Sequence, residues 1–173
     1  MKLPVAVQLY SVRDEMQDDF YGTIKKMKEY GYDGVEFAGL FGEEPAKIRE
    51  FCNEIGIVPI SAHVPYYDML ADPRRCSPTT RDRLQICRRA LSDRGMPPRH
   101  RRLYRHRRGI RKIAEAAKKL GIQLLYHNHD FEFVKLDGEY ALDVLYSTIP
   151  ADLLQTEIDT CWVKVAASTP RNT

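Results

Sequence analysis

Residues 126–132, which read YHNHDFE, concentrate side chains that could carry chemistry. The segment follows a short apolar run and holds two imidazoles, His127 and His129, and two carboxylates, Asp130 and Glu132. Imidazole nitrogens and carboxylate oxygens bind divalent metals, and alternation along an extended strand puts His127 and His129 on the same side. We therefore predict a metal or substrate role for this segment. The alternative is a polar strand end whose histidines cap backbone groups.

A further carboxylate, Asp159, follows the next apolar stretch, in the sequence EIDTCW. If that stretch is a parallel strand, Asp159 lies at the same edge as the histidines and could bind the same metal. The alternative is a helix N-cap, a position where Asp is common. The neighbouring Cys161 and Trp162 are expected to be packing residues, and Cys161 is not expected to be a nucleophile.

Weaker candidates lie at earlier strand ends. His63, in SAHVP, could bind substrate hydroxyls or be a buried histidine whose hydrogen bonds are satisfied. Glu36 lies in an apolar stretch where an unpaired carboxylate is costly, so it should face an open site or pair with a basic neighbour. Gln8 and Tyr10 hold similar positions in the first strand, where packing is an equal alternative.

The composition limits the class of protein. The chain has 173 residues and a mean hydropathy of −0.46, and it has no apolar run near the roughly 18 residues that a membrane span needs. Its four cysteines form no CxxC pair, which argues against a zinc ribbon and a disulfide scaffold. The sequence contains no P-loop, GxGxxG or GxSxG motif and no signal-peptide layout. We expect a cytoplasmic globular protein.

A repeated pattern of amphipathic helix, glycine and apolar strand positions the candidate residues. The helix-ending glycines are Gly31, Gly56 and Gly121. We predict helices at 18–30, 44–55, 110–120 and 140–147, and strands at 5–10, 34–38, 57–63, 122–127 and 153–159. Strands that alternate with helices of this length indicate βαβ units and a parallel sheet or barrel.

The spacing of these glycines predicts one more unit. Gly31 and Gly56 are 25 residues apart, whereas Gly56 and Gly121 are 65 residues apart. One strand and one helix should therefore lie between His63 and Ile110.

That interval contains a window of unusual composition, residues 74–108. It holds 13 of the 17 arginines, no lysine, and only Asp82 and Asp93 as acids, within a chain whose net charge is +3. Arginines are rarely buried without partners, so we predict a loop or disorder for this window and not a strand. Two explanations stay open. One is an out-of-frame stretch of the gene, with residues 167–173 as a second such stretch, and the other is a basic arm for nucleic acid.

Five segments are distinctive in combination: VQLYSVR (7–13), GYDGVE (31–36), SAH (61–63), HNHDFEF (127–133) and EIDT (157–160). Together they resemble the sugar phosphate isomerase/epimerase family, in the xylose isomerase-like TIM barrel group that also contains AP endonuclease family 2-like proteins. The resemblance covers residues 3–73 and 109–166. It implies an α/β fold in which residues 1–173 form a single, incomplete TIM (β/α)8-type barrel with about five or six of the eight strands represented. It also implies a divalent metal (Mn, Mg, Co or Zn).

The resemblance assigns roles to the candidate residues. Asp159 matches a metal-binding aspartate of the family's sixth strand, and His127 stands where the fifth strand carries a glutamate. The implied role of His127 and Asp159 is metal binding, with Glu132 nearby as a group for substrate or metal. From their positions we predict catalysis for Glu132 and His129, and substrate binding for Glu36, His63 and Gln8.

The activity implied by the resemblance is metal-assisted proton abstraction next to the carbonyl of a sugar or cyclitol, as in isomerases, epimerases and inosose dehydratases. The family's last two strands, with their His and Glu ligands, are not represented, so we expect the isolated chain to be inactive. Exposed barrel edges favour homo-oligomers, and neither a membrane nor a nucleic acid is expected as a partner. The alternatives are an endonuclease IV-like or basic nucleic-acid-binding protein, and a non-functional product of a damaged gene.

Overall fold

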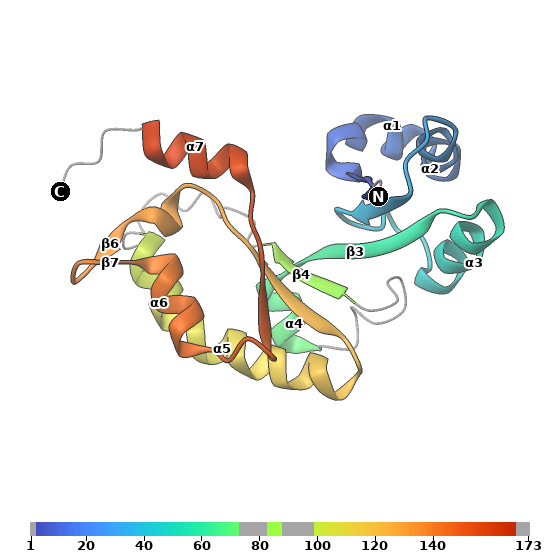
Figure 1. Cartoon of the computed structure of the whole chain (residues 1–173). Coiled ribbons are helices and arrows are strands. Elements are labelled where there is room, and N and C mark those ends of the chain that lie inside the picture. Colours follow the sequence, from blue (N-terminus) through green and yellow to red (C-terminus); the bar gives the residue numbers. More distant parts are fainter. Residues whose placement is uncertain (1–2, 73–82, 88–98, 169–173) are drawn as a thin grey trace.

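The computed structural model describes residues 3–72, 83–87 and 99–168, and a parallel sheet organises them (Figure 1). The sheet has six strands in the order β1-β2-β3-β4-β5-β8. These are β1 (Ala6–Gln8), β2 (Gly34–Phe37), β3 (Val58–Pro65), β4 (Arg83–Cys87), β5 (Gln123–His127) and β8 (Leu154–Glu157). A separate antiparallel hairpin is formed by β6 (Lys135–Leu136) and β7 (Glu139–Tyr140).

Helices lie in the connections between the parallel strands, since each such connection must cross from one end of the sheet to the other, and one more helix follows β8. They are α1 (Arg13–Asp18), α2 (Phe20–Glu29), α3 (Pro45–Ile55), α4 (Tyr66–Ala71), α5 (Arg99–Lys119), α6 (Ala141–Thr148) and α7 (Thr160–Ser168). Figure 1 shows α5 and α6 side by side on one side of β5, with α2 and α3 gathered near the amino-terminal strands.

Particular residues determine where α2 begins and where α3 begins and ends. The Asp19 side chain accepts a hydrogen bond from Gly22 N at 2.9 Å and so caps α2. Pro45 occupies the first turn of α3. A backbone N–H at this position would have no intrahelical acceptor, so proline costs no hydrogen bond here. Gly56 ends α3 with a φ of 70°, a left-handed conformation that glycine adopts without strain.

The hydrophobic core lies between the sheet and these helices. Phe20 of α2 stacks on Phe37 of β2, with ring centroids 6.3 Å apart. Ile113 of α5 and Tyr126 of β5 are fully buried in the same core. Because successive residues of a strand point to opposite faces, this packing turns the alternate residues of each strand, such as His127, toward the inner side of the sheet.

The elements expected from the sequence are confirmed, with shifted ends. The first strand ends at Gln8 and not at Tyr10, because Leu9–Val12 forms a short 3₁₀ helix that buries Leu9. The sequence does not predict α1, α4, α7 or the β6–β7 hairpin. α1 and α4 have six residues each, too few for the helical period to be recognised in the sequence.

The loop predicted for residues 74–108 is wrong for two stretches of that window. β4 lies inside the sheet, where its backbone pairs with β3 (His63 with Gln85) and with β5 (Arg83 with Gln123). Residues 99–108 form the first half of α5. The extra strand and helix predicted from the glycine spacing are therefore confirmed, whereas residues 73–82 and 88–98 lie outside the described part of the chain.

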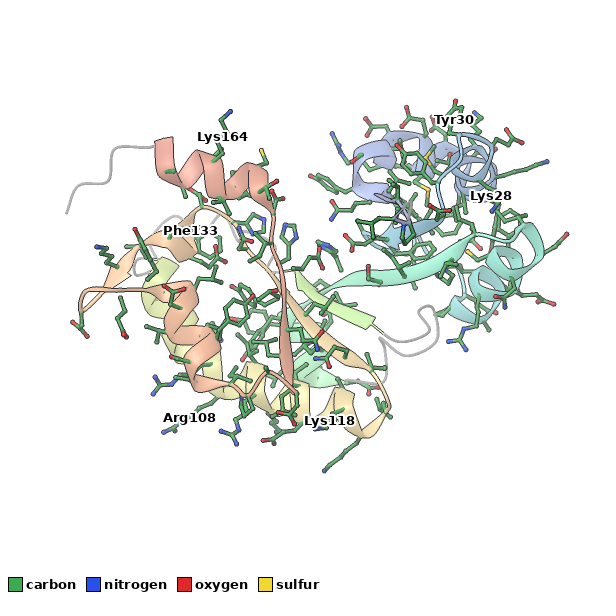
Figure 2. The ribbon with its side chains drawn as sticks, in the orientation of Figure 1. Lys28, Tyr30, Arg108, Lys118, Phe133 and Lys164 are labelled. Atoms are coloured by element: carbon green, nitrogen blue, oxygen red, sulfur yellow. The ribbon has the colours of Figure 1, made fainter. Side chains whose placement is uncertain are left out.

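The prediction fails because a strand joins a parallel sheet through hydrogen bonds of its backbone, and side-chain composition alone does not exclude it. β4 supplies hydrogen-bonding partners for the N–H and C=O groups of both β3 and β5, and the connection between those two strands runs through this window. The arginine-rich start of α5 does not prevent a helix, because arginine has a high intrinsic helix propensity. Figure 2 shows Arg108 and Lys118 on the side of α5 turned away from the sheet.

Residues 106–110 of α5 pack closely on α4. The rings of Tyr66 and His106 meet edge to face with centroids 4.6 Å apart. Gly109 lies so near Tyr66 that a Cβ atom added there would overlap the tyrosine hydroxyl. The next residue, Ile110, is almost fully buried. The end of the arginine-rich window is therefore an integral part of the packed body.

The sheet is an incomplete TIM-type barrel, as the sequence predicts. β1 and β8 are its two edges, and six strands stand where a closed barrel of this type has eight. Val58 and Ile60 of β3 keep 49% and 38% of their surfaces exposed, although barrel interiors are normally filled with such side chains. Among the described residues no helix combines the length and the apolar character that a membrane crossing requires.

Candidate functional site

Polar side chains gather where the parallel strands end. Gln8 ends β1, Glu36 lies near the end of β2, and His63 lies near the end of β3. His127 ends β5 and Glu157 ends β8, and the two are direct partners in the strand register. The carboxyl end of the strands is the edge at which TIM barrels carry their active sites.

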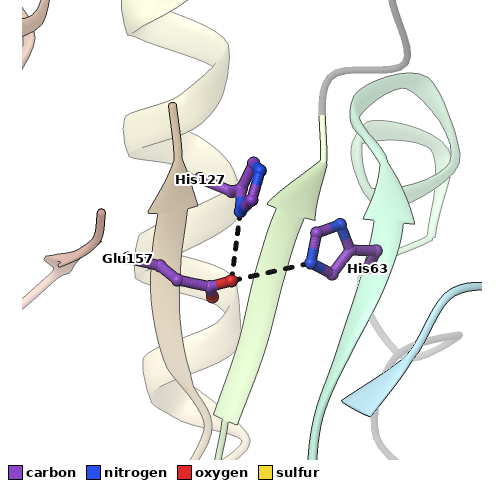
Figure 3. A group of neighbouring side chains, drawn as sticks. All are labelled: His63, His127 and Glu157. Carbon is purple, nitrogen blue, oxygen red and sulfur yellow. Dashed lines mark hydrogen bonds and ion pairs between the residues drawn. The ribbon is translucent and has the colours of Figure 1, made fainter. Parts of the chain in front are cut away.

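Two histidines and a glutamate form the centre of this edge (Figure 3). Glu157 Oε1 lies 3.1 Å from His127 Nδ1 and 3.6 Å from His63 Nε2. One ligand atom from each residue falls within 4.8 Å of the other two. Glu157 Oε2 is buried and has no hydrogen-bond partner among the described residues. Two imidazoles and one carboxylate form a donor set found at catalytic zinc sites, so these residues fit a divalent cation.

Asp159 caps a helix and also lies beside His127. Its Oδ1 accepts a hydrogen bond from Trp162 N at 3.1 Å, which caps the first turn of α7. Its Oδ2 lies 3.4 Å from His127 Nε2, the ring nitrogen that faces away from Glu157. The structure therefore brings Asp159 beside His127, as predicted, but on the other side of the ring from the cluster of three.

A hydrogen-bonded network joins the first three strands next to the cluster. Glu36 Oε1 lies 2.6 Å from Gln8 Nε2 and 2.7 Å from His63 Nε2, and Ser61 Oγ donates to Glu36 Oε2 at 2.6 Å. Burial raises the pKa of Glu36, but the hydrogen bond and charge of His63, with the hydrogen bonds from Ser61 and Gln8, outweigh it and lower that pKa overall. Glu36 is thus an ionised carboxylate that orients His63, which realises the pairing alternative predicted for it.

His129 lies in an aromatic environment beside His127. The ring centroids of His129 and His127 are 5.2 Å apart, and Phe131 and Trp162 flank His129 at 5.7 and 5.3 Å. Burial, together with the charge of His127, lowers the pKa of His129 despite Asp159 and Asp130 nearby. Its Nδ1 is buried and finds no hydrogen-bond partner in the part of the chain that the structure describes.

Glu132 is enclosed behind the site. Its side chain is completely buried, Oε1 accepts from Tyr126 Oη at 2.8 Å, and Oε2 accepts from His129 N at 2.8 Å. These bonds hold the turn after β5 against the strand. Both carboxylate oxygens are therefore engaged in holding the turn, whereas the sequence analysis predicts a catalytic group at this position.

Several residues of the site are not singled out by the sequence alone. Glu157 escapes notice because Asp159, two residues later, is the more prominent carboxylate. Ser61 donates to Glu36 of β2, and Asn128 accepts from the Asp159 backbone beyond β8, so no local pattern marks either residue. Tyr10, which the sequence analysis considers together with Gln8, lies in the 3₁₀ helix and is exposed. The Arg13 guanidinium lies over its ring, 4.8 Å from the centroid.

Known structures share this architecture. No protein-family model matches the sequence, and no curated protein matches it. A sugar phosphate isomerase/epimerase from Parabacteroides distasonis has a TM-score of 0.77 at 16% identity, over 95% of this chain and 68% of that chain. D-psicose 3-epimerase in the presence of D-fructose has a TM-score of 0.72 at 15% identity, over 96% and 67%. The IOLI protein with a binding zinc atom has a TM-score of 0.69 at 8% identity, over 96% and 66%.

At these identities the likeness shows the fold. The chain has the fold of the xylose isomerase-like TIM barrels, as the resemblance implied, and it spans about two thirds of the length of these structures.

Proposed function

We propose that the chain is part of a metal-dependent sugar isomerase, epimerase or inosose dehydratase-like enzyme that acts on a sugar, sugar phosphate or cyclitol. The observation that carries the proposal is the buried Oε2 of Glu157, which has no hydrogen-bond partner within the described ranges and lies beside the ring nitrogens of His63 and His127. A buried carboxylate oxygen without a donor is costly, and a divalent cation would satisfy it. Similar folds in sugar isomerases and epimerases support the same class of chemistry.

The cation would be held by His63, His127 and Glu157, and binding at His63 Nε2 would replace its contact with Glu36. Asp159 would lie on the second nitrogen of His127, in place of the metal-binding role that the resemblance implied for it. When bound, it would supply a Lewis acid that polarises a carbonyl oxygen. Mn, Mg, Co and Zn are all candidates, and the two imidazole donors favour Zn or Co over Mg, which prefers oxygen ligands. The zinc atom in the IOLI structure supports a divalent metal in this fold.

The substrate hydroxyls would be bound by the network of the first three strands. Gln8, Glu36 and His63 lie within 3.0 Å of one another through their polar atoms, at the same edge as the cation cluster. An ionised Glu36 accepts hydrogen bonds from hydroxyls, and the Gln8 amide both donates and accepts. Glu36, which would bind the substrate, therefore lies directly beside His63, which would bind the cation.

Proton transfer would fall to His129. Its Nδ1, for which the described part of the chain supplies no hydrogen-bond partner, can accept or donate a proton, and its ring lies next to His127. We assign Glu132 the structural role of holding the turn that carries His129, in place of the catalytic role predicted from the sequence, because both of its oxygens are buried and engaged. We also propose that the protein acts in the cytoplasm.

Metal-dependent ketose binding tests the proposal. Saturation-transfer NMR with D-fructose and an inosose as probes should show binding in the presence of Co²⁺ or Zn²⁺ and weaker binding without the metal. Gln8→Ala should reduce the transfer, whereas Gln17→Ala, at an exposed glutamine of α1, should not. Equal transfer with and without metal, in wild type and Gln8→Ala alike, would refute the proposed function.

The nucleic-acid alternative rests on the arginine-rich window, whose last residues belong to α5 and include the exposed Arg108 (Figure 2). Binding through phosphate contacts would weaken steeply as salt rises. Salt-dependent retention of a DNA duplex, lost on replacing Arg108 and Arg111 by Ser, would favour that alternative over a sugar enzyme.

A further inference from the structure

Asn128, between the two histidines of the HNH segment, is completely buried. Its Oδ1 accepts a hydrogen bond from Asp159 N at 2.8 Å, and its Nδ2 donates to Asp159 O at 3.2 Å. The last backbone pair between β5 and β8 is His127 with Glu157. The Asn128 side chain therefore extends the contact between these two chain segments past the point where the strand ladder ends.

The two hydrogen bonds hold the backbone of Asp159, whose side chain makes two further contacts. Asp159 Oδ1 caps Trp162 N at 3.1 Å, and Asp159 Oδ2 lies 3.4 Å from His127 Nε2. Both depend on where the Asp159 backbone lies, at a point where the chain leaves an edge strand. A shift of this backbone would move the carboxylate away from His127.

We propose that Asn128 is a positioning residue that keeps the Asp159 carboxylate on His127 Nε2, so that Nδ1 of the same ring is presented to the cation. The inference rests on the proposed function. Metal-binding histidines usually donate their second N–H to a carboxylate, which fixes the tautomer and the ring orientation. Asp159 is then the orienting carboxylate, and Glu157, on the Nδ1 side at 3.1 Å, is the ligand.

The chemistry of the amide explains why asparagine suits this position. One amide side chain offers a donor and an acceptor at the same time, which matches the C=O and N–H of one backbone residue. An alanine would remove both bonds. A leucine of similar size would remove both bonds while still filling the buried space, so it separates the loss of hydrogen bonds from the loss of packing.

The same pair of segments offers a matched control at the other end of β5. Gln123 Nε2 donates to Leu153 O at 3.3 Å and to Leu124 O at 3.0 Å, and it thereby joins β5 to the chain entering β8. Gln123→Ala removes a bridge of the same kind from the edge opposite the site. Any effect that comes only from weaker contact between these segments should appear in both variants.

The experiment measures Co²⁺ affinity and backbone protection in four chains: wild type, Asn128→Ala, Asn128→Leu and Gln123→Ala. Trp162 is the only tryptophan and lies 5.3 Å from the His129 ring, so its fluorescence reports Co²⁺ binding at the site. Amide exchange of Asp159, measured by NMR without metal, reports its hydrogen bond to Asn128. We expect both Asn128 variants to bind Co²⁺ about 10- to 100-fold more weakly, the usual effect of losing such a partner. They should also exchange the Asp159 amide faster, whereas Gln123→Ala should match wild type in both readouts.

The outcomes separate this inference from the function on which it rests. Wild type that binds Co²⁺, with Asn128 variants that bind it equally well, would overturn the inference alone. The inference would also be overturned if Gln123→Ala weakened Co²⁺ binding as much as Asn128→Ala does. Wild type that does not bind Co²⁺ would overturn the proposed function and this inference with it.

Discussion

His127 is the residue around which the candidate site is arranged. Its Nδ1 faces Glu157 at 3.1 Å and its Nε2 faces Asp159 at 3.4 Å, so each ring nitrogen has a carboxylate beside it. One cation can bind only one of these nitrogens, and the other then needs an acceptor for its proton. The two carboxylates should therefore differ in function, one as a ligand and one as an orienting group.

Replacing Asp159 by Asn tests this division. Asparagine is as good an N-cap as aspartate, so α7 should persist, but the charge facing His127 Nε2 is lost. We expect Co²⁺ affinity, measured by calorimetry, to fall about 10- to 100-fold. Asp152→Asn, which removes an exposed carboxylate paired with Lys118, is the control and should leave the affinity unchanged. Complete loss of binding in Asp159→Asn would instead make Asp159 a ligand.

The cysteines provide a second test at this scale. Burial raises the pKa of the Cys52 thiol to about 11, whereas Cys161 is exposed. Below that pKa the thiol of Cys52 stays protonated, and the thiolate is the reactive form. At pH 8 iodoacetamide should alkylate Cys161 rapidly and Cys52 only after denaturant unfolds the chain, as peptide mass mapping would show. Equal rates in the folded protein would contradict the burial of Cys52.

Part of the site is predictable because polar residues at the ends of parallel strands converge on one edge. That rule places Gln8, Glu36, His63 and His127 together, and the structure agrees. It does not identify Asn128, because the role of this amide depends on a backbone group that lies 31 residues away along the chain. The roles of all these residues in binding and catalysis remain predictions.

At the scale of elements, the contact between α4 and α5 is the most sensitive to sequence. Gly109 of α5 leaves room for Tyr66 of α4, and a Cβ there would overlap the tyrosine hydroxyl. The contact ties the arginine-rich beginning of α5 to the helix that follows β3. It is therefore the place at which the unexpected part of the fold can be tested.

Gly109→Ala should destabilise the protein. Alanine favours a helix by about 1 kcal/mol over glycine, but overpacking against Tyr66 typically costs about 1–3 kcal/mol. We expect a net loss in the free energy of unfolding, measured by urea denaturation. Adding Tyr66→Phe, which removes the overlapping hydroxyl, should recover part of that loss. A stabilised Gly109→Ala variant would mean that α5 does not pack on α4 as described.

The order of helices and strands is predictable from the sequence where apolar periodicity is strong. The helix–glycine–strand pattern gives α2, α3 and α5 with their following strands, each ended by a glycine. β4 is not predictable in this way, because its side-chain composition argues against a strand. Its place in the sheet depends on backbone pairing with β3 and β5, which the sequence of β4 does not reveal. The glycine spacing predicts that a unit exists there, but not which residues form it.

At the scale of the whole molecule, the sheet is open. β1 and β8 form its edges, and Val58 and Ile60 leave apolar surface on the inner side. Unpaired edge strands are templates for association with other chains. The cluster of His63, His127 and Glu157, in contrast, is complete without further strands, because all three residues lie on β3, β5 and β8.

The isolated chain should show no measurable epimerase or dehydratase turnover, even with Mn²⁺, Co²⁺, Zn²⁺ or Mg²⁺. The described strands form an open sheet that supplies three candidate cation ligands, whereas such proton transfers need an enclosed, preorganised site. An assay of D-fructose epimerisation by NMR would check this. Robust metal-dependent turnover by the purified chain would show that six strands suffice.

Calorimetric titration of the metal-free chain with Co²⁺, in wild type and Glu157→Gln, tests the central claim most directly. Glutamine keeps the shape of the side chain but removes the charge beside His63 and His127. Wild type should bind one Co²⁺ per chain, and Glu157→Gln should lose that binding while its circular dichroism stays the same. If the two chains bind Co²⁺ equally, or if neither binds it, His63, His127 and Glu157 do not form a metal site.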